Sequence, residues 1–142
     1  MKSNWKESLL TKEKTVRDAA ELLNTTSMRI VMIVDETGRL LGTVTDGDIR
    51  RALIQKKSMD SSLIEIMQHD PVSVQEGTGR RKAIGIMRDR DLLHLPVLDK
   101  MGRIVDLELM QNLVGYHLHH LNLCRLNQIE RVSQNQLDSW LV

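Results

Sequence analysis

The 142-residue sequence is poor in cysteine and in aromatic side chains, with one Cys, two Trp, one Tyr and no Phe. The single thiol, Cys124, cannot form an intrachain disulfide, which excludes the small disulfide-stabilised scaffolds and favours a reducing, cytoplasmic location. The aromatic residues are scattered and the net charge is +1. The chain therefore offers neither a base-stacking surface nor a general attraction to polyanions, and we expect no nucleic-acid binding.

Long hydrophobic runs are also lacking. The longest, residues 30–34, falls far short of the roughly 20 residues that a membrane-spanning helix needs, so no membrane partner is expected. The first residues contain no apolar stretch of signal-peptide length, which again favours the cytoplasm. A chain of this length can bury roughly 68 to 70% of its unfolded surface, so it can form a core without a metal or a disulfide.

What the sequence does contain is an internal repeat with an offset of about 64 residues. Residues 35–39 (DETGR) recur as residues 99–103 (DKMGR), and apolar runs flank each copy on both sides. This pattern predicts two β-hairpins with a glycine in the left-handed conformation at each turn, Gly38 and Gly102.

Helical patterns surround each hairpin. The apolar spacing predicts helices over residues 15–24 and 78–88, with Thr15 and Thr78 as N-caps, and shorter helices after each hairpin. A short strand is expected before each long helix. One unit is too small to bury its apolar face well, so we expect an α+β fold in which two β-α-β-β-α units, residues 1–57 and 58–114, pack sheet to sheet. Residues 115–142 are predicted to form an appended C-terminal helix.

The densest polar cluster, residues 42–51 (GTVTDGDIRR), lies where a strand ends and a helix begins, a place where ligands often bind in α/β layers. The two carboxylate oxygens of Asp48 suit the diol of a ribose, Thr45 adds a hydroxyl, and the apolar strand over residues 30–32 can hold a base. Capping of the helix by Asp46 and Asp48 explains the same residues on local sequence alone. Both interpretations remain open at this point.

The repeat, the string LLGTVTDGDIRR at residues 40–51 and the string LHLPVLD at residues 93–99 together resemble a tandem pair of CBS domains, a regulatory module named after cystathionine β-synthase. The resemblance covers residues 9–114. It implies the two-repeat fold and a nucleotide site in the cleft between the repeats.

The resemblance also assigns residues to that site. It implies that Thr45 and Asp48 bind the ribose of an adenosine nucleotide (AMP, ADP or ATP) and that Gly42 opens the motif. It also implies that main-chain groups of the strand over Ile30, Val31 and Met32 meet the adenine. The implied function is that of a sensor, without catalytic activity or a required cofactor, which controls a partner enzyme or domain. Because modules of this family commonly pair through their helices, the resemblance also implies a homodimer. The motif further resembles modules fused to sugar-phosphate isomerases and sugar nucleotidyltransferases, which implies a sugar-phosphate or sugar-nucleotide enzyme as the partner.

The second copy departs from the motif. The offset of 64 places Leu109 at the position of Thr45, and Asn112 at the position of Asp48, so the hydroxyl is lost and the carboxylate is replaced by an amide. Because charge assistance strengthens such hydrogen bonds, the second copy should bind nucleotide weakly or not at all. We therefore expect at most one good site in each chain.

The sequence identifies phosphate-binding and metal-binding residues less clearly than the ribose-binding residues. Arg51 follows the ribose motif and can face a phosphate, as can the basic residues 80–82, although a solvated helix face is the commoner role for any one arginine.

An alternative function is a metal-dependent sugar-nucleotide enzyme in which Asp46 and Asp48 form an Asp-x-Asp metal site. The chain is short for such an enzyme, and this function leaves the internal repeat unexplained. His117, His120 and Cys124 have helical spacing but lack a fourth ligand, so no metal site is predicted.

Overall fold

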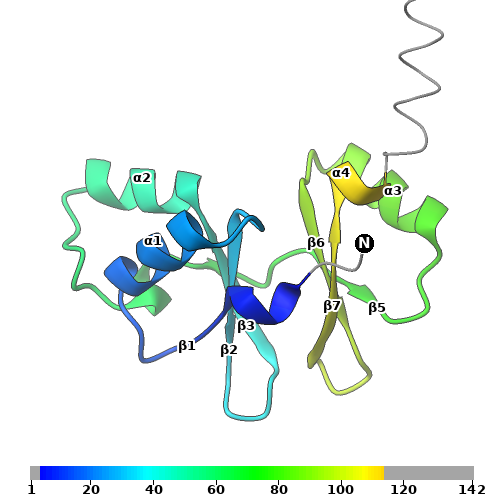
Figure 1. The fold of residues 1–142 in the computed structure, drawn as a ribbon, viewed down its shortest axis with the longest axis horizontal. Coiled ribbons are helices and arrows are strands. Elements are labelled where there is room, and N and C mark those ends of the chain that lie inside the picture. The colour runs from blue at the N-terminus through cyan, green and yellow to red at the C-terminus, as the bar shows by residue number, and fades with distance from the viewer. Residues whose placement is uncertain (1–3, 114–142) are drawn as a thin grey trace, which may run out of the picture.

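The computed structural model describes residues 4–113, which form two consecutive α/β units (Figure 1). The first unit comprises β1 (Leu9–Thr11), α1 (Val16–Thr25), β2 (Ile30–Val34), β3 (Leu40–Thr45) and α2 (Asp46–Ile54). The second comprises β5 (Val74–Gln75), α3 (Arg80–Asp89), β6 (His94–Leu98), β7 (Ile104–Leu109) and α4 (Met110–Leu113). The predicted α+β class with two β-α-β-β-α repeats is confirmed. The helix predicted for residues 115–142 lies outside the described residues.

Three short elements complete the fold. A 3-10 helix, η1 (Trp5–Ser8), precedes β1, while η2 (Leu63–Glu65) and β4 (Gln68–His69) lie in the segment that connects the units. The first sheet has the strand order β1-β2-β3-β4 and the second β5-β6-β7. The connecting segment therefore contributes a strand to the first sheet. No helix in the described part of the chain is long and apolar enough to cross a membrane.

The 64-residue offset is visible in the register of the strands. The antiparallel pair Ile30↔Thr45 between β2 and β3 recurs as His94↔Leu109 between β6 and β7. The two hairpins even share an irregularity at the same place, between Ile33 and Val34 in one and Val97 and Leu98 in the other. The duplication read from the sequence is thus a duplication of backbone geometry.

The two hairpin turns lie side by side and contact each other (Figure 1). Gly38 and Gly102 have φ angles of 86° and 81°, the left-handed conformation that the repeat predicted. The Leu40 N–H donates to the Gly102 carbonyl, and the Ile104 N–H donates to the Gly38 carbonyl, both at 3.1 Å. These reciprocal hydrogen bonds join the two repeats at the turn end of the sheets.

Of the two predicted threonine N-caps, one is confirmed. Thr15 caps α1 in a capping box with Asp18. The prediction for Thr78 is wrong, because α3 begins after Gly79, and the Thr78 hydroxyl donates instead to the Gln75 carbonyl at 2.6 Å. Closing a turn with its side chain leaves Thr78 outside the helix.

Strand β2 is buried along its whole length because its two faces pack against different partners. Val31 and Ile33 point toward the helices of the first unit, in a core that also contains Leu63 and Met67. Ile30, Met32 and Val34 point the other way and join residues of β7 in a second core, Ile104, Leu107 and Leu109. The alternation of a strand thus explains how the two sheets share a hydrophobic core, as expected from the size of each unit.

Candidate functional site

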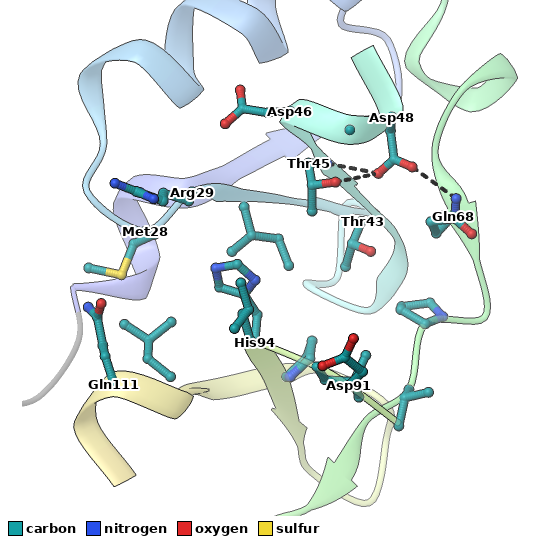
Figure 2. Close-up of a pocket in the computed structure, with 18 of the residues that line it drawn as sticks. Met28, Arg29, Thr43, Thr45, Asp46, Asp48, Gln68, Asp91, His94 and Gln111 are labelled. Carbon is teal, nitrogen blue, oxygen red and sulfur yellow. Dashed lines mark hydrogen bonds between the residues drawn. The ribbon is translucent and has the colours of Figure 1, made fainter. Parts of the chain in front are cut away.

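A cavity of about 550 Å³ lies between the two repeats (Figure 2). Its walls come from five segments: the loop before β2, the β3–α2 junction, the connecting segment near β4, the loop before β6, and the β7–α4 junction. Thr45, Asp48, Ile30 and Arg51, four of the seven residues expected at the site, line it. The structure therefore brings together the polar part of the predicted site.

Thr45 and Asp48 are held together at the start of α2. Oδ2 of Asp48 accepts hydrogen bonds from the Thr45 backbone N–H at 2.8 Å and from the Thr45 hydroxyl at 3.1 Å. Thr15 and Asp18 have the same arrangement at the start of α1, with distances of 2.8 and 3.0 Å. Capping of the helix, the other interpretation of these residues, is therefore also correct for Asp48.

What distinguishes Asp48 from Asp18 is its second carboxylate oxygen. Oδ1 of Asp48 accepts a hydrogen bond from Gln68 Nε2 at 2.9 Å (Figure 2). It also accepts one from Arg51 Nη2 at 2.5 Å. The residue is 4% exposed, and in the described part of the chain no side-chain polar atom is buried without a partner. Asp48 is thus a buried carboxylate with four donors at the edge of a cavity.

Gln68 was not found from the sequence. It lies 20 residues after Asp48, and it reaches the carboxylate because Thr43↔Gln68 pairing places β4 beside β3. No local motif marks a two-residue strand such as β4, so only the pairing of the strands could have revealed the contact.

The hydrogen bonds determine the ionisation of Asp48. Burial alone raises the pKa of its carboxyl group, but the donors Gln68, Thr45 and Arg51 outweigh burial and hold the pKa below the ordinary 3.8. A depressed folded-state pKa contributes stability above the unfolded-state value, and this contribution is lost as the pH falls through 3.8 toward the folded-state pKa.

We therefore expect Asp48→Asn to reduce the acid sensitivity of the fold. Urea unfolding at pH 7 and at pH 3 should show a smaller difference in the free energy of unfolding for the variant than for the wild type. An unchanged difference would contradict the contribution assigned to this carboxylate.

Three residues expected at the site lie elsewhere. Val31 and Met32 are fully buried, Val31 beneath the helices and Met32 between the two sheets. Gly42 is also buried, and it faces β4 rather than the cavity. A Cβ at this position would lie 2.7 Å from the carbonyl oxygen of Gln68 and 2.7 Å from Sδ of Met67. Glycine is thus required here by the close approach of β4.

Replacing Gly42 by alanine should lower the free energy of unfolding by about 1 to 3 kcal/mol, because a backbone carbonyl must move to admit the methyl group. Gly85→Ala is the matched control, since a Cβ there meets open space within α3 and should be neutral or stabilising. Chemical denaturation of both variants measures the difference. Equal stabilities of the two would show that β4 does not restrict position 42.

The second repeat supplies His94 and Asp91, which sequence reasoning also missed. Burial lowers the pKa of His94, a hydrogen bond with the Met28 backbone raises it, and nearby Arg29 lowers it; the net shift is downward, so the imidazole is neutral at pH 7. The 64-residue register was a usable signal, because it places His94 at the position of Ile30, which lines the cavity.

The second copy of the ribose motif is placed differently. Leu109 and Gln111 line the same cavity, whereas Asn112 is exposed and lies outside its walls. Within residues 4–113, no three His, Cys, Asp or Glu side chains are grouped to hold a metal ion, so Asp46 and Asp48 gain no third ligand there. His117, His120 and Cys124 lie outside the described residues.

Comparison with protein-family models gives a match to the CBS domain over residues 9–55 and again over residues 63–107. Among curated proteins, inosine-5′-monophosphate dehydrogenase of Mycobacterium tuberculosis is 32% identical over 90 residues, which are 63% of this chain and 16% of the dehydrogenase. Arabinose 5-phosphate isomerase GutQ of Salmonella typhi is 28% identical over 90 residues, 63% of this chain and 28% of the isomerase. The chain thus spans only a minor part of these two relatives.

Solved structures with the same fold include an acetoin utilization protein (AcuB) of Vibrio cholerae, with a TM-score of 0.70, 27% identity and coverage of 82% of this chain and 87% of that one. The CBS domain pair of protein MJ0100 in complex with 5′-methylthioadenosine and S-adenosyl-L-methionine has a TM-score of 0.68, 25% identity and coverage of 78% and 92%. The cytosolic domain of the Mg²⁺ channel MgtE in complex with ATP has a TM-score of 0.66, 25% identity and coverage of 76% and 44%.

Proposed function

The chain belongs to the CBS domain family, and from this premise we propose that it is a regulatory module that binds an adenosine-type nucleotide between its two repeats and controls a partner enzyme or domain. CBS pair modules are regulatory rather than catalytic, so no reaction is assigned to the site. The adenosine ligands of the MJ0100 and MgtE structures support this choice of ligand.

The observation that carries the proposal is the position of Thr45 and Asp48 at the wall of the cavity. The family resemblance gives these two residues to the ribose, and both border an open space of about 550 Å³. Ile30, at the start of β2, supplies an apolar wall next to them for the base. Arg51 is the cation nearest to the ribose position, where its guanidinium already contacts Asp48.

Binding has a direct route to the rest of the molecule. Both oxygens of Asp48 are hydrogen-bonded, so a ribose hydroxyl that reaches Oδ1 takes the place of a present donor. Arg51 belongs to the same helix as Asp48, whereas Gln68 belongs to the segment that connects the repeats. Displacement of Gln68 would report occupancy to that segment. A ligand shifts the relative packing of two repeats only as far as it prefers one arrangement.

Calorimetric titration with AMP, ADP and ATP tests the proposal, each in buffer with EDTA and in buffer with Mg²⁺. We expect at least one nucleotide to bind in EDTA, with no turnover of any of them. Binding that requires the metal and is accompanied by turnover would overturn the proposal and favour the Asp46 and Asp48 enzyme alternative. Absence of binding by all three would also overturn it.

A homodimer and an enzyme partner are part of the proposal. The two enzyme relatives support a partner of the sugar-phosphate or nucleotide type, in the cytoplasm, without assigning either activity to this chain. The last turn of α2 carries two large exposed apolar side chains, Leu53 at 50% and Ile54 at 73% exposure. Such a pair on one helix suits association through the helices.

Sedimentation equilibrium should therefore show a dimer whose association is weakened by Ile54→Asp, because a charge in an apolar interface is costly. Ile64→Asp is the control, since Ile64 is exposed but lies in η2 rather than α2. A monomer at every concentration, or equal effects of both substitutions, would refute dimerisation through α2.

A further inference from the structure

The charges around the cavity do not match a polyphosphate. Two arginines line it, Arg29 and Arg51, against three aspartates, Asp46, Asp48 and Asp91. One of these arginines is already engaged, because Arg51 is ion-paired with Asp48. The cavity thus retains one cation, Arg29, whose charge is not already balanced by an ion pair with a lining carboxylate.

Two of these carboxylates are unpaired among residues 4–113. The side chains of Asp46 and Asp91 take part in none of the hydrogen bonds or ion pairs there, although the Asp91 backbone N–H donates to the Arg88 carbonyl at 3.3 Å. Figure 2 shows Asp91 across the cavity from Thr45 and Asp48, with His94 between the two sides. His94 is neutral at pH 7 and adds no positive charge.

The start of α2 does not compensate for this deficit. A helix N-terminus attracts phosphate through its free N–H groups and its dipole. Here two aspartates of the first turn, Asp46 and Asp48, already complement that dipole, and the Asp48 carboxylate takes the Thr45 N–H. A phosphate chain entering here meets carboxylates.

We infer that the cavity accepts an adenosine compound with one phosphate or none and discriminates against the triphosphate. This inference rests on the proposed function and narrows it. Each added phosphate brings negative charge toward Asp46 and Asp91, with only Arg29 to offset it, so affinity falls as the phosphate chain grows.

Isothermal titration with adenosine, AMP and ATP tests the inference, in EDTA so that the phosphates keep their full charge. We expect the tighter of adenosine and AMP to bind at least about tenfold more strongly than ATP at low salt, and the ratio to shrink at high salt because salt screens the repulsion. ATP binding as tightly as the others would overturn the inference while leaving the proposed function intact. Failure of all three to bind would overturn the proposed function itself.

Substitution of Asp91 tests whether its charge causes the discrimination against ATP. Asp91 has a φ of 53°, a conformation that asparagine tolerates better than most residues, so Asp91→Asn removes the charge without straining the backbone. We expect it to narrow the preference over ATP about threefold or more, with an unchanged circular dichroism spectrum. Asp89→Asn is the control, because Asp89 ends α3 and does not line the cavity. The assignment to Asp91 would be overturned if Asp91→Asn left the preference over ATP unchanged. It would also be overturned if Asp89→Asn reduced that preference equally.

Discussion

Replacing Met32 by alanine is expected to lower the free energy of unfolding by about 2 to 5 kcal/mol. Met32 is fully buried in the core between the sheets, where β2 of the first repeat packs against β7 of the second. Truncation removes apolar contacts and leaves a cavity that two packed sheets cannot easily close. Because this core joins the repeats, the loss affects the whole module rather than one half.

Urea denaturation of Met32→Ala, with Met101→Ala as the control, measures the effect. Met101 lies at the turn of the second hairpin and is 60% exposed, so its truncation should change stability little. The sequence suggested instead that Met32 meets an adenine. A variant that keeps its stability and loses ligand affinity would support that role and contradict the placement in the core.

The sequence predicted correctly those features that depend on neighbouring residues or that occur in both repeats. The 64-residue offset predicted both hairpins, and the glycines at their turns have the expected positive φ. Thr45 and Asp48 were expected to serve one ligand from the start of a helix, and their side chains do lie together there, joined by a hydrogen bond. The same spacing could not separate capping from binding, because one carboxylate can do both.

The run of apolar residues in β2 was not sufficient to predict which of them line the cavity. Residues 30–32 alternate between the two faces of β2, so they cannot all line one cavity. Ile30 lines it because it begins the strand, while Met32 lies two residues further into the shared core. The packing of the two repeats determines which face of β2 meets the second sheet. The local pattern of apolar residues contains no information about that packing.

Gln68 shows a second limit. Its contact with Asp48 depends on the pairing of β4 with β3, and a two-residue strand has no periodicity to detect. His94 could have been found by extending the 64-residue register to Ile30. Thus long-range partners were predictable through the repeat and unpredictable without it.

Removing the Asp48 carboxylate is expected to weaken binding of the tightest adenosine compound by at least about tenfold, which corresponds to about 1.4 kcal/mol. The ribose would lose a charged acceptor, and charge-assisted hydrogen bonds are the strong ones. Asp48→Ala also removes the cap of α2 and leaves the donors Thr45, Arg51 and Gln68 without their acceptor, so the melting temperature should fall as well. Asp48→Asn retains much of the shape and should show the binding loss with a smaller loss of stability.

Asp18→Ala separates the two effects, because Asp18 caps α1 with the same geometry but does not line the cavity. It should lower the melting temperature as Asp48→Ala does, yet leave ligand affinity unchanged. Asn112→Ala tests the other half of the expectation, that the second copy of the motif has lost its function, and it should change affinity by less than about twofold. If Asp18→Ala weakens binding as much as Asp48→Ala, the loss comes from helix fraying. If Asn112→Ala weakens it equally, the second motif is also a site.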